Sequence, residues 1–522
     1  MTTAETGTRE TQALIVGGGP TGQCASIALS RFGVSSLLVE KHPSTSPFPR
    51  TRSVHRKAME IFRRWGLEGS IHARDLDLEP VMLWAESLTG PVLRRQDYVP
   101  RSNPDLSPCR VSNIFQQDLE PLLLDRARGE KLADLRFSTE LSSLEISGNG
   151  VEATLKSRAN GEESRVRARY LIAADGANSF VRDRLNVSMS GPDHLTENLV
   201  IRFRADLSRW AGPRPPYFYF LLGPHVRALY MTSNDHQWGL NAEDPALAGD
   251  PLAAVRAAIG ADVPIEILGE PATWTTGAQL ADRFRVGPVF LAGDAAHRLT
   301  PAGGMGMNTG VHDIHNLAWK LAAVLGGWAG EGLLDTYEPE RRPAAARNVE
   351  WSLDNWNALQ AGKPWPPPGR PNTEEIDLGG CYESAAIASD GTPAPEPSLE
   401  HIPNGRPGSR APHVWIETHA GRSSTIDLFD REFVLMAGPR GSHWMEAAQV
   451  AARSLAVPLQ TLAIAAPAWQ TVYGVAPDGA VLVRPDGHIA WRSVQGPVDS
   501  AGITACLAGI LSRPMVALTP SP

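Results

Sequence analysis

Residues 13–22, Ala13-Leu14-Ile15-Val16-Gly17-Gly18-Gly19-Pro20-Thr21-Gly22, decide the fold of this chain. The apolar run 13–16 is typical of a buried parallel strand. Gly17 allows a tight turn, Gly19 lets the backbone approach a pyrophosphate, and Gly22 lets the next helix pack closely. Pro20 and Thr21 fall at the start of that helix, where free N–H groups and the helix dipole favour a phosphate. The pattern therefore predicts that Gly17, Gly19, Pro20, Thr21 and Gly22 bind a dinucleotide.

The next helix and strand complete this nucleotide-binding unit. Residues 20–32 carry Ala25, Ala28, Leu29 and Phe32 at helical spacing, and Gly33 closes the helix. A second strand at 37–39 ends at Glu40, about 20 residues past the glycines, where an acid binds ribose hydroxyls. Glu40 and its neighbour Lys41 are therefore predicted to bind the cofactor. The alternative is a glycine-rich turn without a ligand, but strand, helix, strand and acid are all in register.

Two further glycine-acid motifs follow in the chain. They are Asp175-Gly176-Ala177-Asn178-Ser179-Phe180-Val181-Arg182 and Gly293-Asp294-Ala295-Ala296-His297. Together with the first motif they predict a site for one dinucleotide. The three motifs would bind its pyrophosphate, bind its ribityl chain and form the entrance that a second nucleotide must use. This combination points to FAD and to an enzyme that hydroxylates an organic substrate. Only one dinucleotide fingerprint is present, so NADPH or NADH is expected to bind transiently, reduce the flavin and leave.

Composition narrows the class of protein. The chain has 522 residues, enough for two or three domains, and is 42% hydrophobic and 20% charged. Its net charge of −8 and the lack of a basic block argue against nucleic acid as a partner. Four distant cysteines lack metal-type spacing and fit free thiols in a reducing cytoplasm. No signal core and no apolar stretch of about 20 residues is present, so no membrane partner is expected.

The chain divides into several parts. Residues 1 to about 75 hold the nucleotide-binding unit, and residues 196–276 change to short strand-like runs such as 200–203 and 217–222. A buried strand returns at 289–292, and a long helix is predicted over about 311–325. A proline-rich linker then breaks any regular element. A last domain of about 120 residues carries strands at 433–436 and 480–483.

The segment around the third motif resembles a known family. It continues through Pro301-Ala302-Gly303-Gly304-Met305-Gly306-Met307-Asn308-Thr309-Gly310, Asp313, residues 316–320 and residues 337–343. In these features the chain resembles the FAD-dependent aromatic hydroxylases, or group A flavoprotein monooxygenases. It is most similar to the phenol-hydroxylase-like branch, which includes polyketide and indolocarbazole tailoring oxygenases.

The C-terminal part also resembles that family. Segments 410–412, 427–429 and 484–488 look like its thioredoxin-like domain, here without a Cys-x-x-Cys motif and so without an expected redox role. The expected fold class is therefore α/β, with a Rossmann-like FAD-binding domain, an inserted antiparallel-sheet substrate domain and a thioredoxin-like C-terminal domain. The predicted boundaries are 1–195 with 277–362 for the flavin domain, 196–276 with parts of 76–110 for the substrate domain, 363–402 for the linker and 403–522 for the last domain.

The resemblance assigns roles to individual residues. Asp294 would bind a ribityl hydroxyl, and Gln116 would contact the flavin, unless it is only a surface helical residue. Asp175, with Arg182, would serve both FAD and NAD(P)H, although Asp175 could equally cap a turn. Arg50 lies in a matching segment and is the candidate catalytic residue, because a permanent positive charge can hold an anionic reduced flavin or a substrate oxygen. The expected flavin-binding loop and helix start comprise Pro301, Gly304, Gly306, Met307 and Asn308.

The resemblance also implies the reaction. Reduced flavin would react with O2 to give a C4a-hydroperoxide, whose distal oxygen attacks an electron-rich ring, and no metal is needed. Baeyer–Villiger or oxidative-decarboxylating chemistry on a tailored polyketide, or the inactivation of an antibiotic, is an alternative on the same fold. A non-catalytic flavoprotein that binds a reactive intermediate is a third, which degraded flavin motifs would favour; here the motifs are intact. The oligomeric state is open, with a homo-oligomer possible.

The substrate is expected to be a small aromatic: a phenol, a hydroxypyridine or a polycyclic compound. The inserted sheet would supply the wall of its site, although aromatic residues there are as often plain core. Strand alternation predicts Tyr217 and Tyr219 on one face of a strand. His225 and His236 could deprotonate a phenol but are expected to be surface residues. The candidate substrate-binding residues are Tyr217, Tyr219, Tyr230, Trp238 and Pro301, with Phe220 a further aromatic candidate.

Overall fold

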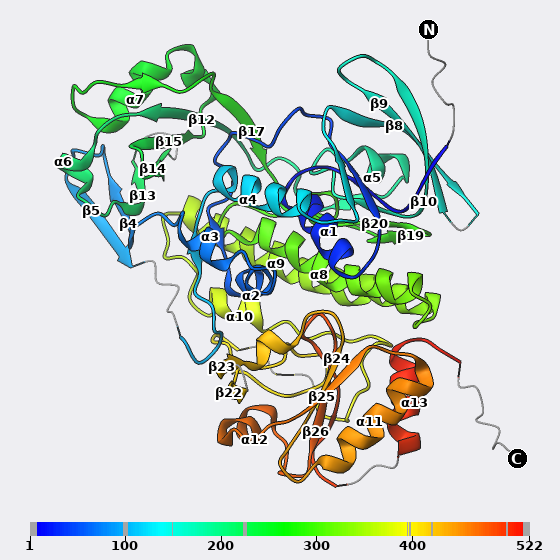
Figure 1. Ribbon diagram of the computed structural model, residues 1–522. Coiled ribbons are helices and arrows are strands. Elements are labelled where there is room, and N and C mark those ends of the chain that lie inside the picture. Colours follow the sequence, from blue (N-terminus) through cyan, green and yellow to red (C-terminus); the bar gives the residue numbers. More distant parts are fainter. Residues whose placement is uncertain are drawn as a thin grey trace, which may run out of the picture.

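Three sheets and two long central helices organise the chain (Figure 1). The computed structural model describes residues 8–97, 103–148, 150–222, 227–393, 395, 398–418, 421–496 and 500–514. The first sheet and the inserted sheet lie on one side of the central helices, and the C-terminal part lies on the other. Within the described ranges, none of the helices is both long and apolar enough to cross a membrane.

The first sheet carries the nucleotide-binding unit. Its main path runs β19-β20-β10-β1-β2-β7, and β8 and β9 extend it from β10. Strands β20, β10, β1, β2 and β7 are mutually parallel, which confirms the Rossmann-like arrangement. The predicted strands at 13–16, 37–39 and 289–292 all lie in it. Its strands are β1 (Arg9–Val16), β2 (Ser36–Val39), β7 (Ala133–Arg136), β8 (Thr139–Ser147), β9 (Gly150–Ser157), β10 (Glu163–Ala173), β19 (Arg285–Val286) and β20 (Val289–Leu291).

Helices pack on this sheet and around it. Helix α1 (Pro20–Arg31) packs against α8 (Met305–Leu325) and α4 (Gln116–Arg128), and buried residues of all three join the main core. Short elements connect them: α2 (Arg56–Arg64), α3 (Glu68–His72), α5 (Phe180–Arg184), β3 (Ser53–Val54), β6 (Ser112–Asn113), β11 (Met189–Ser190), β18 (Gln279–Ala281), β21 (His297–Arg298), η2 (Gly293–Ala295) and η3 (Glu331–Thr336).

Two helix predictions need correction. Helix α8 begins at Met305 and not near residue 311, because Gly304 adopts φ +65° and serves as its N-cap. Gly306, Met307 and Asn308 therefore belong to its first turn and not to a preceding loop. The linker also contains a helix, α10 (Thr373–Leu378), which the side chain of Asn372 caps by accepting from the Glu375 N–H. The predicted proline-rich breaks lie to either side of that helix.

The inserted sheet has the order β16-β12-β15-β14-β13-β4-β5, with β17 also paired to β12. It is not wholly antiparallel, because β13 and β4 run parallel. Helix α7 (Pro251–Ile259) contributes to the apolar cluster on one face. The other elements are β4 (Glu79–Ala85), β5 (Val92–Asp97), β12 (Thr196–Arg204), β13 (Pro216–Leu221), β14 (Arg227–Ser233), β15 (Gln237–Ala242), β16 (Glu266–Ile267), β17 (Ala272–Thr276), α6 (Ser208–Ala211) and η1 (Pro245–Gly249).

The C-terminal part is built on a four-stranded sheet of order β25-β24-β26-β27. Strands β24 and β25 are parallel and the other pairs are antiparallel. Two apolar clusters hold this part together. Its elements are β22 (Trp415–Thr418), β23 (Gly421–Ser424), η4 (Thr425–Leu428), β24 (Phe433–Ala437), α11 (Ser442–Leu455), β25 (Leu459–Ala463), α12 (Pro467–Tyr473), β26 (Ala480–Val483), β27 (Ile489–Ser493) and α13 (Ser500–Ile510).

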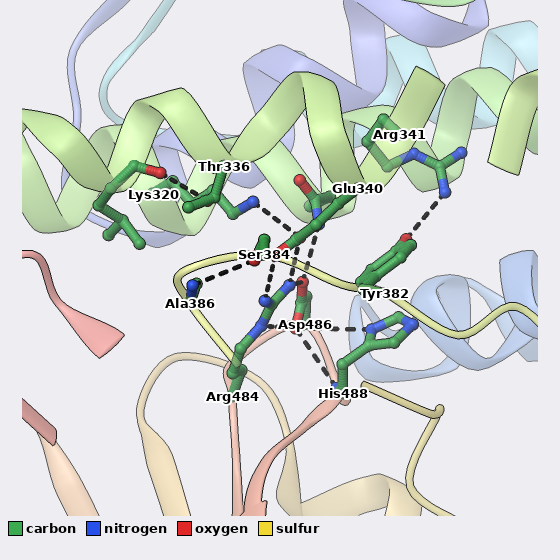
Figure 2. Close-up of polar contacts among 12 residues, drawn as sticks. Lys320, Thr336, Glu340, Arg341, Tyr382, Ser384, Ala386, Arg484, Asp486 and His488 are labelled. Carbon is green, nitrogen blue, oxygen red and sulfur yellow. Dashed lines mark hydrogen bonds and ion pairs between the residues drawn. The ribbon is translucent and has the colours of Figure 1, made fainter. Parts of the chain in front are cut away.

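The C-terminal part docks on the central helices α8 and α9 (Tyr337–Gln360) through apolar and ionic contacts. Trp319 of α8 packs edge-on against Phe433, with ring centroids 5.7 Å apart. Beside this contact, Arg484 donates to both carboxylate oxygens of Glu340 on α9, at 2.7 and 2.8 Å, and also pairs with Asp486 (Figure 2). The interface therefore holds a buried ionic network as well as an apolar core.

Replacing Arg484 tests how much this network holds the chain together. Arg484→Ala leaves Glu340 with Lys320 as its remaining cation and Asp486 without its partner guanidinium, both in a buried setting. We expect the free energy of unfolding to fall by about 3–5 kcal/mol, as for other broken buried ion pairs. Urea unfolding followed by tryptophan fluorescence measures the change.

The matched control is Arg167→Ala, which removes an exposed guanidinium that pairs with Glu152 at 2.7 Å. Exposed pairs contribute little, so this variant should unfold at the urea concentration of the unchanged protein. Equal unfolding midpoints for Arg484→Ala and Arg167→Ala would contradict a stabilising role for the network.

Candidate functional site

The three glycine-acid motifs meet at one edge of the first sheet. Each follows a parallel strand: β1 ends at Val16, β10 at Ala173 and β20 at Leu291. The backbone continues the ladder past these ends, because Ala174 N donates to Val16 O at 2.8 Å and Ala292 N donates to Ala173 O at 3.0 Å. Ligands of open parallel sheets bind outside the carboxyl ends of the strands. The motifs therefore converge as one bound dinucleotide requires.

The first and second motifs are packed backbone against backbone. Gly17 has φ +108°, and a Cβ there would lie 2.1 Å from Ala174 O. A Cβ on Gly22 would lie 1.9 Å from Gly17 O. Both contacts are too short for any side chain. Glycine is needed at these positions so that the turn can close and helix α1 can start directly above it.

The first and third motifs are joined by Thr21. A Cβ on Gly293 would lie 2.6 Å from Thr21 Oγ1, and one on Gly310 of α8 would lie 2.5 Å from it. Thr21 was predicted to bind the cofactor. In the structure its hydroxyl oxygen packs closely against these two glycines. Its side chain therefore spaces α1 from the third motif and from α8.

Glu40 holds the first motif from the next strand. Gly18 N donates to Glu40 Oε2 at 2.6 Å, and His42 N donates to Glu40 Oε1 at 2.8 Å. The carboxylate thus lies beside the glycine turn, where the ribose of a dinucleotide is expected. Its ribose contact remains a prediction, as does a cofactor role for Lys41, whose side chain is exposed.

Open space remains where the cofactor would lie. A Cβ built on Gly19, at the N-cap of α1, or on Gly306, in the first turn of α8, meets no other atom within 4 Å. The free N–H groups of both helix starts can interact with phosphate or with negative charge on a ring. These surroundings fit FAD, with its pyrophosphate at Gly19 and Pro20 and its ring system near Gly304 and Gly306.

Asp294 carries an available acceptor in this region. Its side chain is exposed, and no hydrogen bond to it is found among the described residues. The protein around its inner side still desolvates the carboxylate and raises the pKa of Asp294, against the opposing charges of His297 and Arg50. A carboxylate without a protein partner fits a ribityl hydroxyl donor.

Arg50 lies within electrostatic range of Asp294 and of Glu120, the carboxylate that Gln116 contacts. Arg50 is exposed. Burial raises the pKa of both Asp294 and Glu120, and the positive charge of Arg50 opposes that rise. The buried Gln116 begins helix α4, and its Nε2 donates to Glu120 Oε1 at 2.5 Å. The Arg50 side chain is therefore accessible to a ligand. The amide nitrogen of Gln116, in contrast, already donates to Glu120.

Asp175 has a protein role that competes with its predicted one. Its Oδ1 accepts from Ser179 Oγ at 2.5 Å and its Oδ2 accepts from Val181 N at 3.0 Å. Both oxygens therefore cap the start of α5. Arg182 donates to Ala177 O at 3.0 Å and to Ala295 O at 3.4 Å, which ties the second motif to the third. Capping is the role that the geometry supports.

The side-chain amide of Asn308 is bonded within the protein, and a cofactor contact by this residue stays a prediction. Its Oδ1 accepts from His55 N at 2.9 Å, and its Nδ2 donates to Ser53 O at 3.0 Å and to Gly304 O at 2.7 Å. The amide is occupied in holding β3 against the start of α8. Pro301, by contrast, is exposed, and Met307 is buried.

The predicted substrate-binding aromatics divide between two faces of the inserted sheet. Tyr217 and Tyr230 lie in one apolar cluster, whereas Tyr219 and Trp238 lie in the other, with residues of α7. Tyr217 and Tyr219 were expected on one face, but an irregularity between Pro216 and Phe218 breaks the alternation of β13. Tyr219 and Trp238 therefore belong to the core between the sheet and α7.

The cluster that contains Tyr217 and Tyr230 faces the flavin domain. Phe115, which directly precedes Gln116, stacks on Tyr230 with ring centroids 5.8 Å apart. Arg52 lies over the Tyr217 ring at 3.7 Å and donates to Tyr217 O at 2.6 Å. Phe220 lies in the same cluster. Sequence reasoning missed Arg52 and Phe115, although each lies within two residues of a predicted site residue.

Of the two histidines considered as bases, the structure describes only His236, which does not join the site. His236 is exposed at φ +53° in the turn before β15, and its Nδ1 lies 3.7 Å from Asp206 Oδ1. It is a surface residue, as expected. His225 lies outside the described residues. Within the described ranges, no group of three or more histidine, cysteine, aspartate or glutamate side chains is placed to hold a metal ion.

Comparison with known proteins agrees with this geometry. Residues 10–352 match the family model described as an FAD binding domain, and residues 404–514 match the one described as aromatic-ring hydroxylase, C-terminal. A putative polyketide hydroxylase from Streptomyces halstedii is 39% identical, over 96% of both chains.

Two solved structures are similar over nearly the whole chain. One is the flavin-dependent monooxygenase PieE in complex with FAD and substrate, with a TM-score of 0.89, 31% identity and coverage of 97% of this chain and 99% of that one. The other is a ternary complex of aklavinone-11 hydroxylase with FAD and aklavinone, with a TM-score of 0.88, 34% identity and coverage of 97% and 100%.

Two glycine substitutions separate folding from cofactor binding. Gly19→Val places its side chain in open space at an ordinary backbone φ of −73°, so we expect the apoprotein to melt at an unchanged temperature. The same side chain occupies the pyrophosphate position, so the purified variant should contain little FAD. Thermal unfolding of the apoprotein and the flavin content after purification are the measurements.

Gly22→Val is the comparison variant, because its Cβ would collide with Gly17 O. It should lose both stability and FAD. If Gly19→Val retains the full flavin content, the pyrophosphate does not lie at the start of α1.

Proposed function

Because the chain belongs to the FAD-dependent aromatic-ring hydroxylases, we propose that it is a monooxygenase that hydroxylates a polycyclic aromatic polyketide in secondary-metabolite biosynthesis. The family gives the cofactor, FAD, and the reaction class. NADPH or NADH is the reductant of this class and O2 its oxidant. The observation that carries the proposal is the meeting of three loops at one sheet edge, beside an aromatic cluster of the inserted sheet.

The bound flavin supplies the oxygen-activating chemistry, and the residues of this chain hold and shield it. The N–H groups at the starts of α1 and α8 would hold the pyrophosphate and the ring. Asp294 would accept a hydrogen bond from the ribityl chain. Arg50, exposed and within the electrostatic reach of Asp294, supplies a permanent positive charge to an anionic ring or to a substrate oxygen. Each of these roles follows from position and charge.

The aromatic cluster beneath the inserted sheet supports a flat substrate. Tyr217, Tyr230 and Phe115 present ring faces between the sheet and the start of α4. Aromatic faces favour offset or edge-on packing of another ring system. Relatives that are named for polyketide and aklavinone hydroxylation point to the same substrate class. We place the substrate between this cluster and Arg50, with Pro301 on the flavin side.

The domain division proposed for this function follows the sheets. Residues 1–195 with 277–362 form the flavin domain, and residues 196–276 with parts of 76–110 form the substrate domain. Residues 363–402 form a connecting segment, and residues 403–522 form the last domain. NAD(P)H would supply the reducing electrons from a transient site.

Arg50→Met tests the catalytic assignment. We expect turnover with a polycyclic phenol, NADPH and O2 to fall about a hundredfold, because one preorganised charge at the reacting group is removed. Mass spectrometry of the product made under ¹⁸O2 measures the incorporation of one labelled oxygen. Steady-state rates of the unchanged enzyme and the variant give the loss.

Arg74→Met is the matched control, since Arg74 is also exposed and its guanidinium donates to Ser70 O within its own helical turn. It should turn over at the unchanged rate. Insertion of the labelled oxygen into a ring C–C bond would replace hydroxylation with Baeyer–Villiger chemistry. Flavin that no nicotinamide reduces, with or without a polycyclic phenol, would favour a non-catalytic flavoprotein.

A further inference from the structure

A buried carboxylate of α8 holds the third motif in place. Asp313 Oδ2 accepts from Gly293 N at 3.1 Å and from His297 Nε2 at 2.7 Å. Its Oδ1 accepts from Arg341 Nε at 2.8 Å. Burial disfavours the charged form, but His297 and Arg341 hold the pKa of Asp313 below its usual value. The turn that carries Asp294 is therefore attached to one ionised, fully buried group.

Arg341 extends this attachment to the linker. Its Nη1 donates to the hydroxyl of Tyr382 at 2.8 Å, and its Nη2 donates to Thr309 O at 3.3 Å. Tyr382 is buried in the segment that leads to the C-terminal part, and Figure 2 shows its hydroxyl pointing at the Arg341 guanidinium. The guanidinium thus lies between the Asp313 carboxylate and a residue outside the first sheet and its helices.

The last member of this chain of contacts is His488, between β26 and β27. Its ring stacks on that of Tyr382, with centroids 4.1 Å apart and an interplanar angle of 22°. Its Nδ1 lies 3.6 Å from Asp486 Oδ1, beside the Arg484–Glu340 pair (Figure 2). Burial lowers the pKa of His488 to about 4, so the ring is neutral at pH 7. A contiguous buried path therefore runs from the C-terminal sheet to Gly293.

A second branch leaves the same histidine. His488 Nε2 lies 3.4 Å from Lys57 Nζ on α2. Two residues earlier, His55 Nε2 lies 3.0 Å from Gly303 O, in the other loop that faces the ring system. Burial lowers the pKa of Lys57 to about 7. One side chain of the C-terminal part thus contacts both Tyr382, which accepts from Arg341, and Lys57, which lies two residues along the chain from His55.

We propose that Tyr382 and His488 are positioning residues of the cofactor site, through which the C-terminal domain fixes the Gly293–Asp294 turn by way of Arg341 and Asp313. Neither residue touches the cofactor. Asp313 accepts from three donors, and these contacts leave its carboxylate one orientation. Gly293 directly precedes Asp294, so a change in the direction of its N–H would also change the direction of the carboxylate that is proposed to bind the ribityl chain.

Tyr382→Phe tests this proposal. It keeps the ring that stacks on His488 and removes only the hydroxyl that accepts from Arg341. We expect the FAD dissociation constant of the apoprotein to rise about tenfold, the usual effect of losing a hydrogen bond to a charged group. Quenching of FAD fluorescence measures the dissociation constant. At saturating FAD, the visible circular dichroism of the bound flavin should also change.

Ser384→Ala is the matched control. Ser384 lies two residues further along the same segment, and its hydroxyl donates to Glu340 Oε1 at 2.6 Å, outside the path to Asp313. Both variants lose one hydroxyl contact to a charged group, which is buried at Tyr382 and partly buried at Ser384. Ser384→Ala should keep the unchanged FAD affinity and flavin spectrum, while the two apoproteins melt at similar temperatures.

Three outcomes overturn the proposal: an unchanged dissociation constant in Tyr382→Phe, equal losses in both variants, or a loss that simply follows the melting temperature. If the apoprotein of Tyr382→Phe does not fold, His488→Gln replaces it, because this change removes the stacked ring and leaves the tyrosine hydroxyl. Weaker FAD binding by His488→Gln at an unchanged melting temperature supports the proposal, and unchanged binding contradicts it.

Discussion

The structure depends on the close approach of three backbone turns at one edge of a parallel sheet. Gly17 lies against Ala174 O, and Gly293 lies against Thr21, at distances that leave no room for a Cβ. Such contacts are possible only because β1, β10 and β20 are adjacent and parallel, so that their carboxyl ends coincide. This packing leaves open space at Gly19 and Gly306, where we propose that FAD binds.

This edge is supported from below by buried charge. Asp313, Arg341 and Glu340 are almost fully buried, and each is paired and hydrogen-bonded. Burying ions costs free energy, and well-packed apolar groups in the same place can stabilise a protein equally well. A buried ionic network is therefore weak evidence of stability by itself. A carboxylate that accepts from several fixed donors does fix the orientation of those donors. The Asp313 carboxylate in this way fixes the direction of the Gly293 N–H. The network therefore matters for the geometry of the site as much as for its stability.

Local signals in the sequence predicted the sheet edge and the cofactor, because glycine spacing and a terminal acid act within about 25 residues. They misplaced the start of α8, since nothing local shows that Gly304 caps it. The prediction that Tyr217 and Tyr219 share one face of β13 was wrong, because strand alternation cannot reveal the irregularity near Pro216. The Tyr382–Arg341 and His488–Lys57 contacts join residues 41 and 431 positions apart, which periodicity cannot pair.

A crystal structure of the protein with FAD tests the central claim most directly. We predict one FAD per chain, with its pyrophosphate at the N–H groups of Gly19 and Thr21 and a ribityl hydroxyl within hydrogen-bond distance of Asp294. Asp313 should still accept from Gly293 N in that complex. A dinucleotide bound away from the Gly17–Gly22 turn, or a ribityl chain held by residues other than those of the third motif, would contradict it.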